Sequence, residues 1–324
     1  MNSYLGLSDS KETCNNFHIP RPLRKGDKIA LVSPASAVKE EYVKGAVNRI
    51  AEMGFEPILM PHALGPQNGS YSAICKDRFS DLSEAVRDDS IRAILCNRGG
   101  YGCVQLLRDL SPEFIVNHPK WIIGFSDISV LHALWLMSGV ASIHGPMAKH
   151  LTIEPKNDFC TKTLFQILEN GGKFDYTIPS SSHSQPGKCS GILRGGNMAV
   201  LNGLGATPYD IFDIKEGENV ILFFEDVNEA IYSIERMLWR LFLSGTLNRV
   251  KGLIFGQFSD YKPDRNFDTM EQMIINTLEE MKIPPIPIVF DFPIGHVSQN
   301  YPLTEGVPVE LEISSDFTRL KTLL

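Results

Sequence analysis

The sequence predicts an α/β protein in which a doubly wound parallel sheet is followed by a smaller α/β unit. In residues 21–150, short apolar runs alternate with segments of helical periodicity, a pattern typical of a parallel sheet flanked by helices. A turn-rich stretch interrupts this alternation, and the pattern then resumes. We therefore predict a tail at residues 1–20, a first α/β domain at 21–170, a connector at 171–190 and a second α/β domain at 191–324.

The first domain opens with a strand, a helix and a second strand. Residues 28–32 and 56–60 are short apolar runs that indicate buried strands, and Gly54 stands where the intervening helix would end. Helical spacing is shown by Val43, Val47, Ile50 and Met53. The crossover of such a unit should be right-handed.

Three more strands and three more helices complete the predicted first sheet. We expect the strands at residues 91–96, 121–124 and 141–144, and the helices at 77–86, 104–110 and 127–139. The ends of parallel strands share one edge of a sheet, and open α/β folds bind ligands at the carboxyl edge. Polar residues that directly follow these strands are therefore the first candidates for a functional site.

The second domain repeats the alternation with different spacing. This half starts with residues 191–197, which are followed by an apolar stretch as far as Gly205. We expect strands at residues 219–224, 250–255 and 286–290, helices at 231–242 and 270–281, and an exposed strand at 307–313, where apolar and polar residues alternate. No internal repeat or low-complexity tract is present.

Composition excludes several classes of protein. Of the 324 residues, 43% are apolar and 21% are charged, and the formal net charge is −7 with no basic block, so we do not expect a nucleic-acid partner. No apolar run approaches the ~20 residues of a membrane span. Residues 1–16 lack the apolar core of a signal peptide, and the six scattered cysteines fit a reducing compartment. We predict a cytoplasmic protein without a membrane-inserted segment, and the cysteine and histidine spacings indicate no metal site.

Three polar residues at strand ends suggest nucleophilic catalysis. Ser126, Glu225 and His296 each follow an apolar run closely. A serine hydroxyl needs a neighbouring base to take its proton, and that base needs an orienting carboxylate. The order Ser, Glu, His along the chain is one that serine hydrolases use. Alternative interpretations are a helix N-cap for Ser126, a solvated carboxylate for Glu225 and an ordinary loop histidine for His296, and the turn at Ser126 does not match G-x-S-x-G.

The glycine-rich residues 98–102 form the next candidate. Glycines allow a backbone to approach a ligand closely, so an N–H of this loop could join that of Asp127 in an oxyanion hole. A phosphate-binding loop is the alternative, although the pattern fits neither G-x-G-x-x-G nor the P-loop, and a simple tight turn is a third interpretation.

Two further residues are candidate substrate contacts. His144 ends a predicted strand beside the proposed site, and Arg194 could hold a substrate carboxylate because a guanidinium matches its geometry. A structural turn and a surface ion pair are the respective alternatives. Of the neighbours Glu225 and Asp226, only Glu225 is assigned to the triad, because adjacent strand residues point to opposite faces.

Four short motifs, taken together and in order, resemble a known family. They lie at residues 98–102, 124–127, 224–226 and 295–296, and residues 33–35, 144–146 and 194–197 strengthen the resemblance. The chain is similar over roughly residues 22–320 to the LD-carboxypeptidases, a serine peptidase family that includes the microcin C self-immunity proteins. The sequence around Arg98 is closer to the murein LD-carboxypeptidase branch.

The resemblance implies a fold and a mechanism. A flavodoxin-like first domain would carry the nucleophile Ser126, and the second domain would supply His296 as general base and then acid, with Glu225 orienting it. The backbone N–H groups of Gly100 and Asp127 would stabilise the oxyanion, while Arg98, His144 and Arg194 would contact substrate. The family needs no metal or cofactor and is often homodimeric.

The resemblance also implies a substrate. The family reaction releases terminal D-alanine from the murein tetrapeptide during cytoplasmic wall recycling. One departure concerns the loop after His296, which reads Val297, Ser298, Gln299 and Asn300 where a threonine or similar small residue is expected. Two alternatives stay open: a microcin-immunity-like hydrolase of aminoacyl or peptidyl nucleotide conjugates, and a non-enzymatic module that binds phosphate or sugar through residues 98–102.

Overall fold

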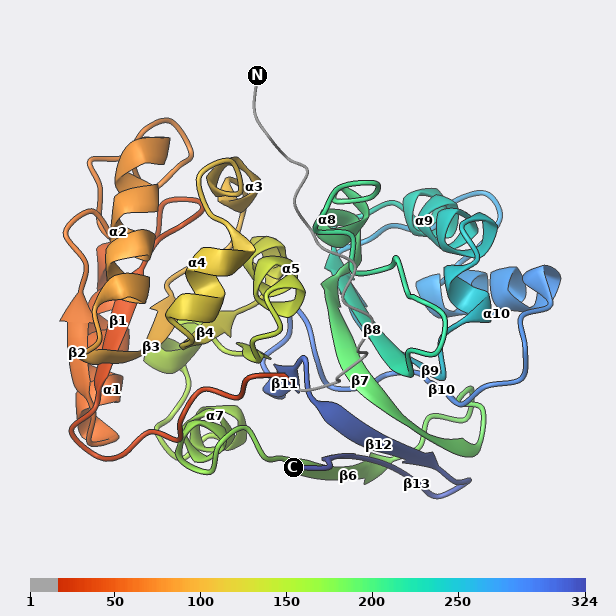
Figure 1. The fold of residues 1–324 in the computed structure, drawn as a ribbon. Helices are drawn as coiled ribbons and strands as arrows, with labels where there is room; N and C mark the ends of the chain where they lie inside the picture. Colours follow the sequence, from red (N-terminus) through yellow and green to blue (C-terminus); the bar gives the residue numbers. More distant parts are fainter. Residues whose placement is uncertain (1–16) are drawn as a thin grey trace.

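Two β-sheets form the framework of the protein, which a computed structural model describes over residues 17–324 (Figure 1). Helices pack around both sheets. Residues 1–16 lie outside the described residues. They include most of the predicted tail at residues 1–20, the segment predicted not to be a signal peptide, and Cys14.

The first sheet has the predicted doubly wound topology. Its strands are β1 Lys28–Val32, β2 Glu56–Leu59, β3 Ile91–Cys96, β4 Trp121–Gly124, β5 Ser142–His144 and β11 Leu303–Glu305, in the order β11-β5-β4-β3-β1-β2. The strands β1 to β5 run parallel in the order 2-1-3-4-5, which is the flavodoxin arrangement. The strand β11 comes from the far end of the chain and pairs antiparallel with β5.

The helices around this sheet are α1 Glu40–Glu52, α2 Cys75–Arg87, α3 Cys103–Leu106, α4 Pro112–Asn117, the 3₁₀ turn η1 Ser126–Ile128, α5 Ser129–Met137, α6 Ala148–Ile153 and α7 Phe159–Glu169. Of these helices, α1, α2 and α5 lie where the sequence pattern predicts a helix, whereas α4, α6 and α7 were not predicted. The helix expected at residues 104–110 is wrong in extent, because α3 stops at Leu106. A new helix starts after Ser111, whose hydroxyl accepts a hydrogen bond from Phe114 N (3.3 Å) and which precedes a proline at the first helical position.

The second sheet has seven strands in the order β10-β9-β8-β7-β12-β13-β6. Their bounds are β6 Asp175–Pro179, β7 Gly187–Asn197, β8 Val220–Val227, β9 Gly252–Ser259, β10 Ile288–Val289, β12 Pro308–Ile313 and β13 Phe317–Thr322. Strands β7 to β10 run parallel. On the other side of β7, β12 pairs antiparallel with β7, β13 antiparallel with β12, and β6 antiparallel with β13. The helices beside this sheet are α8 Met198–Asn202, α9 Ile231–Leu243, the 3₁₀ turn η2 Thr246–Asn248 and α10 Met270–Met281.

Two features of the second sheet differ from expectation. Residues 171–190, expected as a connector, contain β6 and the start of β7. The strand β6 is held by pairing with β13, a partner far along the chain that local composition does not show. The expected exposed strand, β12, pairs on both sides, and its alternation arises because one face is buried while the other is half-exposed.

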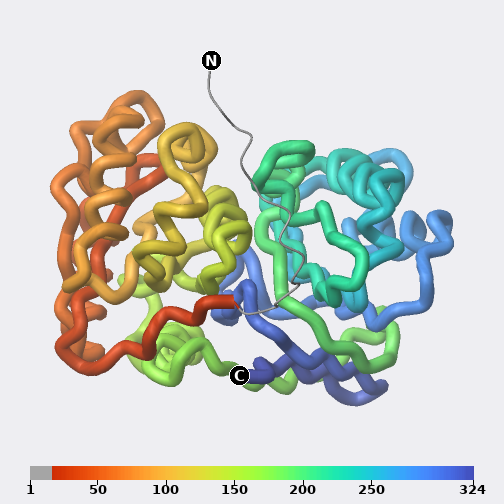
Figure 2. Tube along the Cα trace, in the orientation of Figure 1, coloured from red at the N-terminus to blue at the C-terminus, as the bar shows by residue number. Residues whose placement is uncertain are grey.

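The chain crosses between the sheets after β10. Figure 2 shows this C-terminal segment, in blue, returning to the middle of the molecule, where β11 joins the first sheet before β12 and β13 rejoin the second. One apolar core serves both sheets, because buried Ile143 and Leu303 of the first share it with Leu193 and Phe223 of the second. The segment that carries His296 is therefore fixed between the two sheets.

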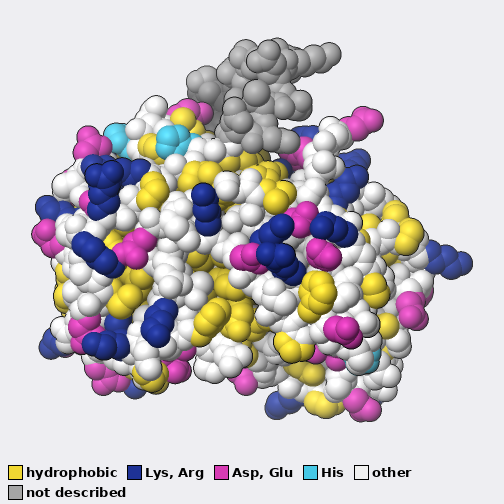
Figure 3. Space-filling view, turned by 90° about the horizontal axis from the view of Figure 1, so that it is seen from below, with side chains coloured by type: hydrophobic (Ala, Val, Ile, Leu, Met, Phe, Trp, Pro, Cys, Tyr) yellow, Lys and Arg dark blue, Asp and Glu magenta, His cyan; other side chains and the backbone are white. Residues whose placement is uncertain are grey.

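Charged side chains of both signs are spread over the surface. On the face shown in Figure 3, Lys and Arg side chains lie scattered among Asp and Glu. Within residues 17–324, no helix has both the length and the apolar character that crossing a membrane requires.

Candidate active site

Ser126 occupies a strained turn between β4 and α5. Its φ is 66°, a region that non-glycine residues rarely adopt. The residue before η1 is Phe125, in extended conformation, so Ser126 is not the N-cap and its hydroxyl is not used as a cap. A strained strand-to-helix turn that presents a serine hydroxyl is the geometry of a nucleophile elbow, although the surrounding sequence does not match G-x-S-x-G.

Glu225 and His296 form a buried pair. His296 Nδ1 lies 2.7 Å from Glu225 Oε2, and the Glu225 side chain is fully buried. A carboxylate only accepts hydrogen bonds, so Nδ1 carries the proton and Nε2 is left as the basic atom. The ladder between β8 and β9 shifts register between Phe224 and Asp226, and such bulges re-aim side chains near active sites.

Asp226 serves a different part of the structure. Its carboxylate accepts from Asn197 Nδ2 at 3.0 Å and from Ala199 N at 2.8 Å, at the start of α8. Glu225 and Asp226 therefore have separate partners, as their alternation along a strand predicts. Burial raises the pKa of Asp226 to about 6, and the charge of Glu225 adds to that rise.

The pKa of His296 is raised above its ordinary value. Burial of the ring lowers this pKa, but the hydrogen bond and the negative charge of Glu225 outweigh burial, with further help from Asp226. The pair therefore stabilises the imidazolium that forms when His296 accepts a proton.

Phe125 connects the serine turn with the histidine loop. Its ring packs edge-on against that of His296, with centroids 4.9 Å apart. Ser126 directly follows Phe125, so the structure brings Ser126, Glu225 and His296 into one region from two sheets. Within residues 17–324, the His296 side chain bonds to Glu225 and not to Ser126 Oγ; serine–histidine hydrogen bonds often tighten only when substrate binds.

The glycine loop after β3 lies directly against the serine turn. A methyl group added at Gly99 would lie 2.8 Å from Ser126 Cβ and 3.1 Å from Asp127 N. Gly100 has a φ of +107°. The loop is held by Ser36, whose N donates to Gly99 O (3.2 Å) and whose hydroxyl accepts from Tyr101 N (3.1 Å).

Two backbone N–H groups of this region are available to a ligand. In the part of the chain that the structure describes, the N–H groups of Gly100 and Asp127 donate to no acceptor outside their own elements. The side chain of Asp127 is occupied, because its carboxylate accepts from Cys103 N (2.9 Å) at the start of α3. The geometry suits an oxyanion hole built from these two N–H groups.

Arg78 supports the glycine loop. It was not among the residues predicted from the sequence. Its guanidinium is 2% exposed and donates to Pro34 O at 2.6 Å and Gly102 O at 3.1 Å. The loops after β1 and β3 are thereby joined through one side chain. A detectable sign was its place four residues before the apolar Leu82, because a charged residue on the buried face of a helix needs internal partners.

Asn300 holds the loop that carries His296. Its side-chain Oδ1 accepts from Gly295 N at 3.0 Å, and Asn300 is 2% exposed. Gly295 has a φ of +122°, and a methyl group there would lie 3.0 Å from Glu225 Cβ. Asn300, the last residue of the loop that departs from the family pattern, is thus a buried anchor beside the pair.

His144 lies beneath the site and not on its surface. It is fully buried, and burial, followed by the nearby His132 and His296, holds its pKa well below the usual value. Its ring packs near Phe125, with centroids 5.8 Å apart. In this conformation His144 is therefore not positioned to contact a substrate directly.

The two candidate arginines have other partners. Arg98 is exposed and donates to Ala37 O at 2.6 Å. Arg194 lies in β7 and pairs with Glu218, with Nη2 and Oε1 3.2 Å apart. Glu218 precedes β8, whose other end carries Glu225, so the guanidinium runs away from the triad. The ion-pair alternative describes Arg194, although the pair is largely buried.

Four cysteines are poor candidates for a nucleophile. Burial raises the pKa of the thiols of Cys96, Cys103, Cys160 and Cys189. For Cys160 the pKa rises to about 12, and for Cys189 to about 11. Such thiols are protonated at neutral pH, and the thiol form is not the nucleophile.

Two family models match the chain. The model of the LD-carboxypeptidase N-terminal domain matches residues 29–145, and that of the LD-carboxypeptidase C-terminal domain matches residues 190–311. The first match contains Ser126, and the second contains Glu225 and His296.

Individual proteins are similar over almost the whole chain. A protein named probable murein peptide carboxypeptidase, from Bacillus subtilis, is 31% identical over 295 residues, which cover 89% of this chain and 89% of that protein. The microcin C7 self-immunity protein of Escherichia coli is 24% identical, with coverage of 91% and 93% respectively. The crystal structure of muramoyltetrapeptide carboxypeptidase from Oxalobacter formigenes superimposes with a TM-score of 0.80 at 25% identity, covering 91% of this chain and 98% of that one.

Proposed function

Because this chain belongs to the LD-carboxypeptidase family and is a serine-type carboxypeptidase, we propose that it releases terminal D-alanine from murein tetrapeptides in cell-wall recycling. The observation that carries the proposal is the Glu225–His296 hydrogen bond of 2.7 Å beside a serine held at a positive φ. Relatives named as murein peptide carboxypeptidases support the substrate class.

The proposed reaction uses the site residues in sequence. Ser126 Oγ attacks the carbonyl carbon of the bond to the terminal D-alanine while His296 Nε2 takes the hydroxyl proton. The N–H groups of Gly100 and Asp127 bind the oxyanion. The C–N bond then breaks, and His296 returns the proton to the leaving amine. A water molecule releases the acyl group from Ser126 by the same steps, with His296 again the base.

The test of this function uses defined substrates and one substitution. Ser126→Ala should remove nearly all release of D-alanine, by roughly 10⁴-fold or more, because serine and histidine of a triad act as a unit. The readout is mass spectrometry of a murein tetrapeptide, with circular dichroism to show that the variant folds. Substantial turnover by the folded variant would contradict the proposed nucleophile.

A second substrate class follows from the microcin-immunity relative. That protein is similar over 91% of this chain, so the same triad could cleave an aminoacyl nucleotide conjugate. Parallel incubation with tetrapeptide and with an aminoacyl sulfamoyl adenosine separates the two. We expect the tetrapeptide to be cut faster, and the reverse order would assign this chain to the second activity. A cytoplasmic location and a homodimeric state remain predictions of the family resemblance.

A further inference from the structure

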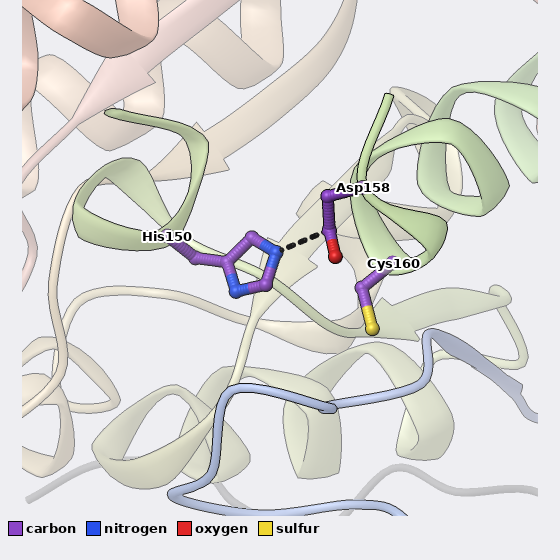
Figure 4. Close-up of side chains that lie close together, drawn as sticks. All are labelled: His150, Asp158 and Cys160. Atoms are coloured by element: carbon purple, nitrogen blue, oxygen red, sulfur yellow. Dashed lines mark hydrogen bonds and ion pairs between the residues drawn. The ribbon is translucent and has the colours of Figure 1, made fainter. Parts of the chain in front are cut away.

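A second group of reactive side chains consists of residues outside the proposed triad, and Figure 4 shows how they lie. His150 belongs to α6, Asp158 is the N-cap of α7, and Cys160 lies in the first turn of α7. One ring nitrogen, one carboxylate oxygen and the thiol sulfur all lie within 4.8 Å of one another. Within residues 17–324, no other three His, Cys, Asp or Glu side chains meet this closely in a form that could hold a metal ion.

We propose that His150, Asp158 and Cys160 bind a zinc ion, with water as the fourth ligand. Thiolate, imidazole and carboxylate are the donors that zinc takes in proteins, and the soft sulfur disfavours magnesium and calcium. With zinc–ligand bonds of about 2.0–2.3 Å, ligand atoms of a tetrahedral site stand about 3.4–3.6 Å apart. The three side chains are thus already grouped near the required separations.

The surroundings hold the three groups in place. Asp158 Oδ2 accepts from His150 Nε2 at 2.8 Å and from Thr161 N at 2.9 Å, so both the ring and the carboxylate are oriented. Cys160 is 1% exposed as a residue, and its sulfur interacts with the backbone N–H of Asn300. Fixed second partners of this kind are what keep metal ligands aligned.

The cluster is open to an incoming ion on one side. The side chains of His150 and Asp158 are 12% and 19% exposed, whereas Cys160 lies behind them. Zinc would replace the hydrogen atom between His150 and Asp158, with the ring proton moving to Nδ1 of His150. Cys160 would bind as thiolate, and its proton would pass to solvent, so each zinc bound releases one proton.

Zinc at this position would connect two parts of the active-site framework. Cys160 contacts Asn300 through the backbone, and the Asn300 side chain holds Gly295, the residue before His296. The ion would therefore tie α6 and α7 to the loop that carries His296. It would act as a structural ion and takes no part in the proposed peptide cleavage.

Two similar pairs in the same chain supply matched controls. His183 and Glu271 lie 2.7 Å apart, and His62 and Asp81 lie 2.8 Å apart. Each offers an imidazole and a carboxylate in the same kind of contact as His150 and Asp158, but neither belongs to a three-ligand group. If a histidine–carboxylate pair alone bound zinc, these pairs would bind it too.

The experiment titrates metal-free full-length protein with zinc by calorimetry and follows cobalt binding by near-ultraviolet absorption. We expect one zinc per chain, a raised Tm, and a thiolate-to-cobalt charge-transfer band. Cys160→Ser should abolish the band and weaken zinc binding by more than about 100-fold, since even second-shell changes cost 10–100-fold. His150→Gln and Asp158→Asn should weaken it comparably, while His183→Gln and Ser126→Ala should leave it unchanged.

Several outcomes would overturn the site. Failure of the wild type to bind zinc at micromolar concentration would do so, as would wild-type affinity in Cys160→Ser. Zinc binding lost in His296→Gln but kept in Cys160→Ser would place the ion at the triad. If Cys160→Ser does not fold, the cobalt spectrum of the wild type tests the site by itself. Cobalt that binds without a thiolate charge-transfer band would exclude Cys160 as a ligand.

Discussion

The positions of Ser126 and His296 depend on the residues that hold them. The positive φ of Ser126 is tolerated because the buried β4 and α5 fix the turn from both sides. Glu225 is fully buried, so its charge would be costly without the His296 partner. A residue-scale prediction follows from the raised pKa of this histidine.

Glu225→Gln should change the pH profile as well as the rate. A general base must be neutral, and the pKa of His296 lies above its ordinary 6.5, so wild-type kcat/KM should rise with pH through an acid limb above pH 6.5. Removing the Glu225 charge should move that limb to lower pH and reduce kcat by roughly 10³–10⁴-fold. The measurement is D-alanine release across pH.

The control for this prediction is Glu271→Gln, which makes the same change in the exposed His183 pair and should leave the profile unaltered. An acid limb that stays in place in Glu225→Gln would show that another group titrates there. The raised pKa of His296 also affects the stability of the fold. Protonation of His296 stabilises the folded state fully at pH values below the pKa of the unfolded chain, and this stabilisation is lost as the pH rises through the pKa of the folded state.

At the scale of elements, loops that follow strands build the site. The turn after β1, the glycine loop after β3 and the serine turn after β4 lie at neighbouring strand ends of the first sheet, where β1 and β3 form the topological switch point. Their contacts are close enough that a single methyl group matters. Gly99 bears directly on the proposed nucleophile, because a methyl group there would face Ser126 and Asp127 together.

Gly99→Ala should reduce kcat by roughly 10²–10³-fold, a loss comparable to that of one oxyanion donor. The added methyl would stand 2.8 Å from Ser126 Cβ, so the serine turn or the glycine loop must shift. Steady-state kinetics checks this, with Gly203→Ala as the control, since its nearest new contact is Val200 O at 3.2 Å, outside the site. An equal kcat in the two variants would contradict the prediction, because it would mean that the glycine loop accommodates the methyl group without disturbing the site.

Sequence reasoning identified the ends of these elements but not all of their side-chain directions. Ser126, Glu225 and His296 were detectable because each closely follows an apolar run. The direction of Arg194 was not, because a long side chain can reach Glu218 as easily as a ligand. The burial of His144 depends on Phe125, in the turn after β4, and on Phe223 of β8, whose rings pack against its ring.

At the scale of the whole molecule, β11 was the feature hardest to predict. Leu303–Glu305 is three residues long, too short to show a period, and its partner β5 lies far earlier in the chain. The parallel order of β1 to β5 was predictable because each strand carries its own apolar run and helix. The pairing of β11 with β5 arises only in the tertiary structure, and the local sequence of neither strand shows it.

A fragment of residues 1–170 should therefore be much less stable than the full chain. It would lose the pairs Leu303–His144, Thr304–Ile143 and Glu305–Ser142, and part of the apolar core shared with Leu193 and Phe223. We expect a lower Tm and faster proteolysis, with partial recovery when residues 171–324 are added. A fragment that melts at the Tm of the full chain would contradict this view of the assembly.

The position of β11 also sets the order of events during synthesis. A ribosome produces β1 to β5 first, yet the strand that completes their sheet emerges after His296 and shortly before the last two strands of the chain. Long-range pairing of this kind slows folding, because the intervening loop must close before the contact forms. The nascent protein therefore carries Ser126 long before it can carry the complete proposed site, and we expect the proposed cleavage only from a nearly complete chain.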